Sequence, residues 1–285
     1  MSDIVKVAAI QQRVTGDRDK DVERAKERVA FAAQKGAALA VFPELFGWPW
    51  FPADMDPKAF GMAQTLEGEW IHAMRDVAKE HGIAVAAPLF LHDGQGTYFN
   101  AVVAIEAGGQ VVGDYRAVHL PQIPGWEGKF YFAGGEDYPV MHLAGMPVGF
   151  AICWDAFFPE AFRILTLKGA RAICVLSSAT GAGEDLWTRA LTAQAFFNGV
   201  YIVRVNRVGT EGEVAFTGGS FAAAPTGDLL GDPMGEVEGV ALYDIDRRAV
   251  EMTRREFPFL KDRQPRTYFD LPNLRILTKE DPGQG

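Results

Sequence analysis

The sequence predicts an α/β layered fold with mixed sheets, and two observations carry that prediction. Short apolar runs typical of buried strands alternate along the chain with segments of helical periodicity. Pairs of strand-like runs joined by short turns stand between them, so part of the pairing must be antiparallel. No linker, low-complexity tract or break in composition divides the 285 residues, which predicts a single domain over residues 1–285.

The first elements are a strand at 5–10, a helix at 17–35, a strand at 38–42, a helix at 69–81 and a strand at 83–91. Apolar residues recur three or four positions apart in both helical segments, which is the spacing of one helix face. Gly36 and Gly82 follow these segments directly, and glycine is the residue most typical of a helix end.

Two hairpins come next, one pairing 99–105 with 110–116 and the other pairing 140–143 with 148–152. They are followed by helices at 161–169 and 187–198, strands at 172–176, 200–206 and 240–245, and a short pairing of 220–224 with 229–230. From about residue 256 the chain is polar and contains proline. We expect this tail, 256–285, to lie on the surface or against a partner subunit.

Charge and composition exclude several classes of protein. The 28 Lys and Arg residues against 37 Asp and Glu give a net charge of -9, so no nucleic-acid partner is expected. Two cysteines form no disulfide framework, and the five scattered histidines show no metal-ligand spacing, so no metal is predicted. We expect no membrane association, because no apolar stretch reaches bilayer length. The absence of a signal-peptide pattern predicts a cytoplasmic protein.

Cys153 is the strongest candidate for a catalytic residue. It follows the apolar run in the segment GFAICWD at 149–155, and a Pro-Glu pair that can open a helix comes soon after. This pattern predicts an exposed thiol at the end of a buried strand, in a sharp turn with free backbone N–H groups. The alternative is a small buried core cysteine, which is our interpretation of Cys174 in the middle of a strand.

Three further segments accompany the cysteine: FPEL at 42–45, YRAVHL at 115–120 and WEGKFYF at 126–132. With YFNA at 98–101, NR at 206–207, TGGSF at 217–221 and KDRQP at 261–265, the chain resembles the nitrilase superfamily of carbon–nitrogen hydrolases. The likeness is to the amidase and N-carbamoyl-amine hydrolase branches and runs through nearly the whole chain. It implies a four-layer α–β–β–α sandwich with two mixed β-sheets. It also implies a homodimer or higher homo-oligomer that pairs through helical faces, with crossing C-terminal tails.

The resemblance implies a cysteine mechanism without a cofactor. Cys153 attacks the amide carbon as a thiolate, and Glu44 takes and returns the proton, for which burial must raise its pKa. Ammonia leaves, a thioester forms, and water activated by Glu44 hydrolyses it. The backbone N–H of Trp154 is a candidate donor to the oxyanion. The alternative for Glu44 is a helix-capping or ion-paired glutamate.

The sequence departs from the family at its third catalytic position, where the lysine after the Tyr-Arg pair is replaced by Ala117. Alanine carries no charge and no donor, and loss of one oxyanion donor costs about a hundred- to a thousandfold in rate. Three explanations stay open. The chain is an engineered variant of an active enzyme, or a natural variant that uses Arg116 or Lys129, or a protein that kept the pocket and lost the chemistry.

A second departure concerns the positioning glutamate of the family, whose place is taken by Gly128. We expect Glu127 to perform this role through a shifted loop, with Glu136 as a weaker candidate. The expected substrate-binding residues are aromatic side chains near the catalytic segments and polar ones after the strand that carries Cys174: Trp48, Trp126, Tyr131, Trp154, Thr180 and Arg189. Arg189 would pair with a substrate carboxylate. His119 and Asp155 are interpreted as structural.

These observations predict hydrolysis of a linear, non-peptide C–N bond in a primary amide or an N-carbamoyl amine or amino acid, with release of ammonia. The Cys-Trp-Asp order at 153–155 favours the amidase and carbamoyl branches over true nitrilases, which by resemblance more often have Cys-Trp-Glu. Nitrile hydrolysis is the alternative within the same class. A non-catalytic binding or scaffold protein on the same fold is the alternative from another class, and Ala117 is its main support.

Overall fold

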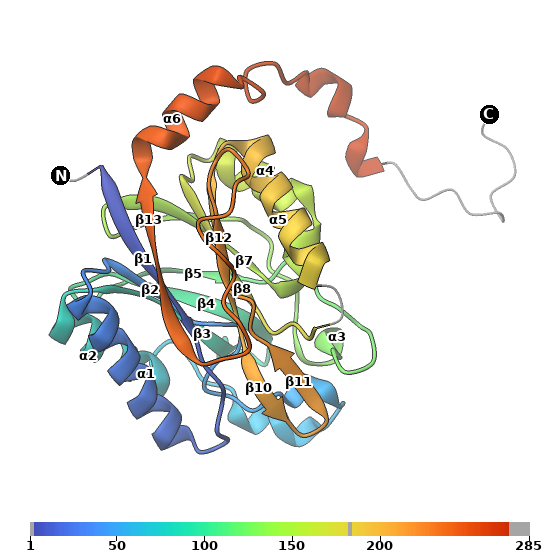
Figure 1. Ribbon diagram of the computed structural model, residues 1–285. Coiled ribbons are helices and arrows are strands. Elements are labelled where there is room, and N and C mark those ends of the chain that lie inside the picture. Colours follow the sequence, from blue (N-terminus) through green and yellow to red (C-terminus); the bar gives the residue numbers. More distant parts are fainter. Residues whose placement is uncertain (1–2, 182–183, 274–285) are drawn as a thin grey trace, which may run out of the picture.

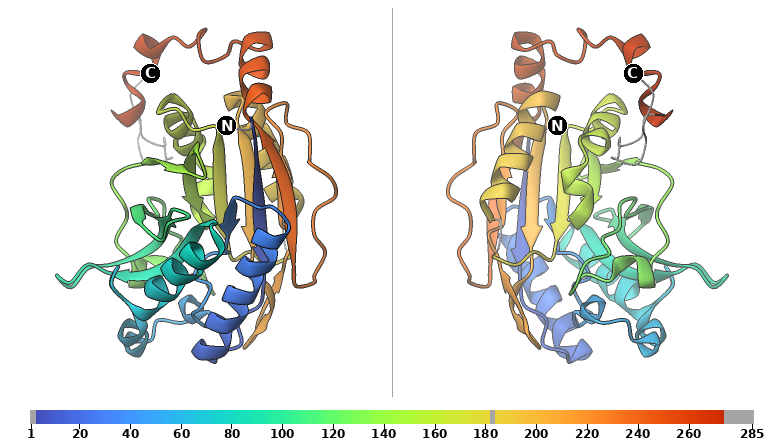
Figure 2. Two further views of the ribbon diagram at one scale, coloured as in Figure 1. Left: turned by 90° about the vertical axis from the view of Figure 1, so that its left-hand side faces the viewer. Right: turned by 90° about the vertical axis from the view of Figure 1, so that its right-hand side faces the viewer.

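The computed structural model describes residues 3–181 and 184–273. Two β-sheets pack face to face, and helices cover the outer face of each (Figure 1). The two views in Figure 2 have α1 and α2 toward the viewer on one side and α4 and α5 on the other, so the helix layers lie on opposite faces. The predicted four-layer α–β–β–α sandwich with two mixed sheets is therefore confirmed.

The first sheet has the strand order β13-β1-β2-β3-β4-β5. Its central strands β1, β2 and β3 run parallel, and β13, β4 and β5 pair antiparallel to their neighbours. The strands are β1 (Ile4–Gln11), β2 (Leu39–Val41), β3 (Ala84–His92), β4 (Tyr98–Ile105), β5 (Val111–Arg116) and β13 (Gly239–Asp246).

The second sheet has the order β12-β9-β8-β7-β6 and repeats this arrangement, with β7, β8 and β9 parallel and an antiparallel strand at each edge. Its strands are β6 (Val140–Leu143), β7 (Met146–Ile152), β8 (Ala172–Ser177), β9 (Tyr201–Asn206) and β12 (Phe221–Ala223). Parallel strands need crossover connections, and these supply the outer helices.

The helices are α1 (Arg18–Gln34), α2 (Glu69–His81), α3 (Gly128–Tyr131), α4 (Pro159–Leu167), α5 (Glu184–Asn198) and α6 (Arg247–Glu256). The Asp17 side chain accepts from the Lys20 N–H at the start of α1, and Gly82 ends α2 in the left-handed conformation. Among the described helices, none is both long and apolar enough to cross a membrane.

Side chains alternate between two cores along each strand of the first sheet. Val7 and Leu39 belong to the core between the sheets, together with Phe150 of the second sheet. Ala8 and Ala40, one position further along, belong to the core beneath α1 and α2. Cys153 follows β7 directly and Glu44 lies in the turn after β2, so each sheet carries one of them to the space between the sheets.

Several elements were not expected from the sequence, among them the one-turn helix α3. The hairpin of β10 (Val208–Glu211) and β11 (Val214–Thr217) pairs outside the main sheets, and α6 follows β13. Beyond α6, Phe257 and Phe259 pack on Phe196 of α5, with ring centroids 5.2 and 5.4 Å away. The chain then leaves the body of the molecule along an exposed path (Figure 1). The interface role of the tail stays a prediction, and residues 274–285 lie outside the described residues.

Candidate active site

Glu44 lies in a tight turn after β2, and side chains from two distant segments, Arg207 and Ser178, bind the main chain of this turn. Leu45 adopts a left-handed φ of 48° in this turn. The Arg207 guanidinium, fully buried, donates to the carbonyl oxygens of Glu44, Leu45 and Trp48 at 2.7–3.2 Å. The Ser178 hydroxyl also donates to the Glu44 carbonyl, at 3.2 Å. These bonds fix the turn and so fix the direction of the carboxyl group.

Cys153 occupies a strained turn between β7 and a single 3-10 turn at Cys153–Phe157. Its φ of 45° lies in the left-handed region that side chains other than glycine rarely adopt. The Asp155 carboxylate stabilises the turn, because it accepts from the Ile152 N–H at 3.0 Å and from the Tyr115 hydroxyl at 2.6 Å. The sharp turn was predicted correctly, but Cys153 is only 6% exposed, so the expectation of an exposed thiol is wrong.

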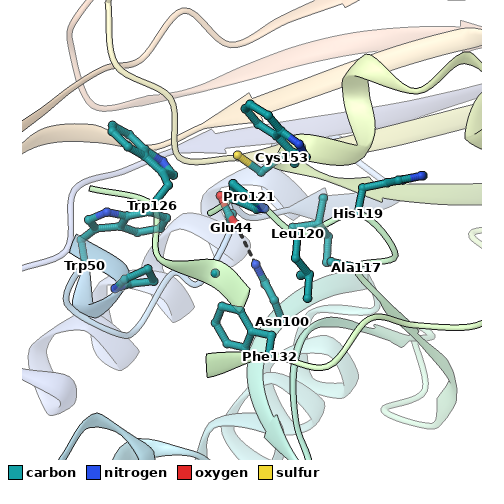
Figure 3. A pocket seen from close by; sticks show the side chains of 14 residues that line it. Glu44, Trp50, Asn100, Ala117, His119, Leu120, Pro121, Trp126, Phe132 and Cys153 are labelled. Atoms are coloured by element: carbon teal, nitrogen blue, oxygen red, sulfur yellow. Dashed lines mark hydrogen bonds between the residues drawn. The ribbon is translucent and has the colours of Figure 1, made fainter. Parts of the chain in front are cut away.

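Glu44, Cys153 and Ala117 meet in one small cavity between the two sheets (Figure 3). The Asn100 amide donates to Glu44 Oε1 at 2.7 Å. Burial raises the pKa of the Glu44 carboxyl, and it raises the pKa of the Cys153 thiol well above the usual range, with the charge of Glu44 acting in the same direction. Burial therefore disfavours the charged form of both groups, and a nearby positive charge would favour it.

Asn100 lines the cavity and contacts Glu44, and the sequence did not predict this position as part of the site. It belongs to β4 and comes from the segment YFNA, which carried the resemblance without a stated role. Glu127, the expected positioning residue, lies outside the cavity and accepts a hydrogen bond from Gln122 instead. Gly128 does line the cavity, and a Cβ atom built there would come within 2.9 Å of the Pro121 carbonyl oxygen. A side chain at this position is therefore excluded unless the loop moves.

Neither proposed substitute for the missing lysine reaches the cavity. The Arg116 guanidinium pairs with Asp114 and stacks on the Phe99 ring, 4.3 Å from its centroid. Lys129 is exposed and is not part of the cavity lining. Glu136 is exposed as well.

His119 lines the cavity, but its ring turns away from Cys153 in Figure 3. The ring stacks on Phe158 with centroids 3.5 Å apart, and Nδ1 lies 3.0 Å from Asp155. The structural interpretation of both His119 and Asp155 thus agrees with their contacts. Within residues 3–181 and 184–273, no group of three His, Cys, Asp or Glu side chains is arranged to hold a metal ion.

A second, larger pocket of about 190 Å³ adjoins the catalytic cavity and shares Cys153, Trp126 and Trp154 with it. Its described lining is almost entirely apolar and aromatic: Ile123, Trp126, Cys153, Trp154, Phe157, Ser178, Ala179, Thr180, Leu186 and Trp187. No Asp, Glu, Lys or Arg occurs among these described lining residues. An uncharged, flat group fits such a surface better than an ion does.

Three residues expected in the substrate pocket lie elsewhere. Trp48 packs edge-on against Trp70 and donates its indole N–H to the Met62 carbonyl, in the core beneath the outer helices. The Tyr131 hydroxyl donates to the Asp54 carbonyl at 2.6 Å, away from the catalytic cavity. Arg189 is exposed on α5 and donates to the Asp185 carbonyl, so it does not line either pocket. By contrast, Trp126, Trp154 and Thr180 do line a pocket beside Cys153.

The sequence and fold of the chain are similar to those of known carbon-nitrogen hydrolases. A model of the carbon-nitrogen hydrolase family matches residues 6–255. The chain belongs to this family. It is 32% identical to an N-carbamoylputrescine amidase of Solanum tuberosum over 95% of this chain and 96% of that protein. It is 34% identical to a nitrilase of Pyrococcus abyssi, over 93% of this chain and all of that one.

Two solved structures show the same fold. A carbon-nitrogen hydrolase from Helicobacter pylori superposes with a TM-score of 0.92 at 28% identity, covering 96% of this chain and all of that one. An amidase from Nesterenkonia sp. AN1 superposes with a TM-score of 0.78 at 25% identity, covering 93% and 95%. The structure is of a glutamate-to-glutamine mutant of that amidase, with the acetamide moiety of fluoroacetamide covalently added at its active site cysteine.

Proposed function

We propose that the protein hydrolyses a primary amide or an N-carbamoyl compound through Cys153. The observation that carries the proposal is the joint burial of the Cys153 thiol and the Glu44 carboxyl in one cavity, with Asn100 bound to Glu44. A carboxylate held there accepts the thiol proton, and the sulfur attacks the carbonyl carbon. Relatives whose names include N-carbamoylputrescine amidase and citrullinase support this reaction class.

Collapse of the tetrahedral adduct breaks the C–N bond, and Glu44 returns the proton to the departing ammonia. The acyl group stays on sulfur as a thioester. Water then loses a proton to Glu44 and attacks the thioester, which releases the acid and restores the thiol. The N–H of Trp154 opens a single helical turn in which it has no internal carbonyl partner, so it is placed to bind the oxyanion.

The adjoining pocket supports a narrower substrate class, an amide or N-carbamoyl compound with a neutral, flat apolar substituent. Trp187, Phe157 and Trp154 form a continuous aromatic wall, with ring centroids 4.8 and 5.9 Å apart. Contact with this apolar wall favours the binding of an aryl or arylalkyl group. A carboxylate would bind poorly, because the described lining contains no cation to pair with it.

Ammonia release from matched amides and N-carbamoyl compounds tests the proposal, with aryl, cationic and anionic substituents compared. The chain and Ala117→Lys are assayed side by side, because Ala117 supplies no charge. We expect turnover by the lysine form, with the highest kcat/KM for aryl substituents. Trp187→Ala should lower kcat/KM for these substrates at least about tenfold. Arg189→Ala, on the same helix, is the matched control and should leave it unchanged.

Other outcomes would count against the proposal. Acid formed from nitriles but not from amides would assign the protein to nitrile hydrolysis. Turnover restricted to charged substrates would reject the aromatic pocket as the determinant of specificity. No turnover by either form across the panel, with slow thiol labelling of both, would favour the scaffold alternative.

A further inference from the structure

Two buried oxygen atoms in the cavity have no partner within hydrogen-bond distance and angle among the described residues: Glu44 Oε2 and Asn100 Oδ1. The Cys153 thiol is the side chain that interacts with the Glu44 carboxyl from the other sheet. Glu44 and Asn100 are each only 5% exposed, and both line the cavity that also contains Ala117 and Cys153 (Figure 3). Buried acceptors in proteins are almost always satisfied, since an unpaired one costs about 1–3 kcal/mol. The pair of oxygens therefore calls for a ligand that donates hydrogen bonds.

Two buried arginines act on the pair through their charges, Arg207 on Glu44 and Arg204 on Cys153, and the hydrogen bonds described for them go to other groups. Arg207 lowers the pKa of Glu44 through its charge, but its N–H groups donate to main-chain carbonyls and to Glu211 at 2.7 Å. Arg204 donates to Ser177 and lies over the Trp187 ring. Burial outweighs the effect of the Arg207 charge and leaves the pKa of Glu44 raised.

The wall beside Ala117 cannot collapse onto the two oxygens. The Ala117 N–H donates to the Asn100 carbonyl at 2.9 Å, and the Ala117 carbonyl accepts from the Gly135 N–H at 2.8 Å. The backbone is thus held from both sides, and alanine contributes only a methyl group. The cavity retains about 10 Å³, roughly the room that one water-sized group occupies.

We propose that this cavity is a binding site for the ammonium ion, held by Glu44 Oε2 and Asn100 Oδ1. The ion has the size of the space, donates to both acceptors and brings the positive charge that Ala117 lacks. Bound there, it keeps Glu44 ionised and able to accept the Cys153 proton. A water molecule would also donate hydrogen bonds to these oxygens but would bring no charge. The test must therefore distinguish a bound cation from bound water.

One consequence rests on the proposed function. If the protein releases ammonia from its substrate, its own product in the ammonium form loads this site. Hydrolysis by the unmodified chain would then start slowly and accelerate as ammonium accumulates. Ammonium added at the start would remove the lag.

Alkylation of Cys153 by iodoacetamide tests the site without requiring turnover. The thiolate sulfur displaces iodide, so the rate reports how readily the thiol proton is transferred. We would measure labelling in ammonium, sodium and tetramethylammonium chloride at equal ionic strength and fixed pH. Peptide mass spectrometry separates Cys153 from Cys174, which is fully buried and serves as an internal control.

An opposite charge within about 4–6 Å shifts a pKa by 1–3 units, so ammonium should accelerate Cys153 labelling at least about tenfold, with saturation. Sodium and tetramethylammonium should not. Ala117→Lys should label fast without ammonium and show no response to it. Ala117→Leu, which fills the cavity without charge, should label slowly in every salt.

The comparison of cations uses the unmodified protein, so it does not depend on whether any variant folds. Equal acceleration by tetramethylammonium, no acceleration by ammonium, or an undiminished ammonium response in Ala117→Leu would each overturn the site. An ammonium response without turnover of any substrate would leave the site standing and reject the proposed function. Turnover that starts without a lag, in a protein whose Cys153 labelling rate does not respond to ammonium, would reject the ammonium site and leave the proposed function standing.

Discussion

Replacing Asp155 with alanine removes the acceptor at the centre of the network that holds the Cys153 turn. Oδ1 accepts from the His119 N–H at 2.9 Å and lies 3.0 Å from His119 Nδ1. Oδ2 accepts from the Ile152 N–H at 3.0 Å and from the Tyr115 hydroxyl at 2.6 Å. Asp155 is fully buried, so water cannot replace these bonds without a change in packing.

The expected loss follows from which donors are left unpaired. Burial and the charge of Asp155 raise the pKa of the Tyr115 phenol well above its usual range, so it stays a donor. Asp155→Ala strands this hydroxyl and the Ile152 N–H, and breaking such a buried network costs about 3–5 kcal/mol. Asp155→Asn keeps one acceptor oxygen, and the Tyr115 hydroxyl can turn and accept, so about 1–2 kcal/mol should be lost.

Urea unfolding followed by tryptophan fluorescence measures these differences in the free energy of unfolding. Tyr115→Phe is the matched control for a single lost hydroxyl and should cost about 1–2 kcal/mol. Combined with Asp155→Ala, it should add little, because its partner is already gone. A loss below about 1 kcal/mol for Asp155→Ala would refute the reasoning, since it would show that the network contributes no more than an ordinary surface contact.

Three further predictions concern the same turn and cavity. Burial raises the pKa of Glu44 above its usual 4.5, so stability should fall as pH rises from about 4.5 through the raised value. Glu44→Gln should abolish that fall in thermal unfolding, and an identical pH profile would contradict it. Cys153→Gly should be about 1 kcal/mol more stable to urea than Cys153→Ala, because glycine tolerates the φ of 45°; the opposite order would mean that the turn is unstrained. In the Ala117→Lys background, Glu127→Gln should leave kcat unchanged and Asn100→Ala should lower it, and a reversed pattern would restore Glu127 to the site.

The fold could be predicted closely because its elements are locally consistent. The helix predicted at 69–81 coincides with α2, since its apolar face and Gly82 both mark it. The helix predicted at 161–169 begins two residues earlier as α4, because Pro159 is well suited to a first helical position. α6 has a single narrow buried face of Val250 and Thr253, which gives little apolar periodicity to detect.

The candidate site could be predicted only in part. Glu44 and Cys153 each follow a buried strand, and that local pattern is visible in the sequence. The contact between Asn100 and Glu44 joins residues 56 positions apart and depends on how β4 lies against the turn after β2. Glu127 and Gly128 are adjacent, yet only Gly128 faces the cavity, because the loop conformation and not the spacing decides which one turns inward.

Glu44 and Cys153, the proposed general base and nucleophile, follow strands of different sheets, and the core between those sheets sets the distance between them. Reactivity therefore depends on the thickness of a hydrophobic layer far larger than the site. Any loosening of that layer, by heat or by a smaller side chain such as alanine at Phe150, separates the two reacting groups before either sheet comes apart. Catalytic activity should therefore be more sensitive than secondary structure to loss of core packing. On heating, we expect activity to decrease at temperatures where the secondary structure is still intact.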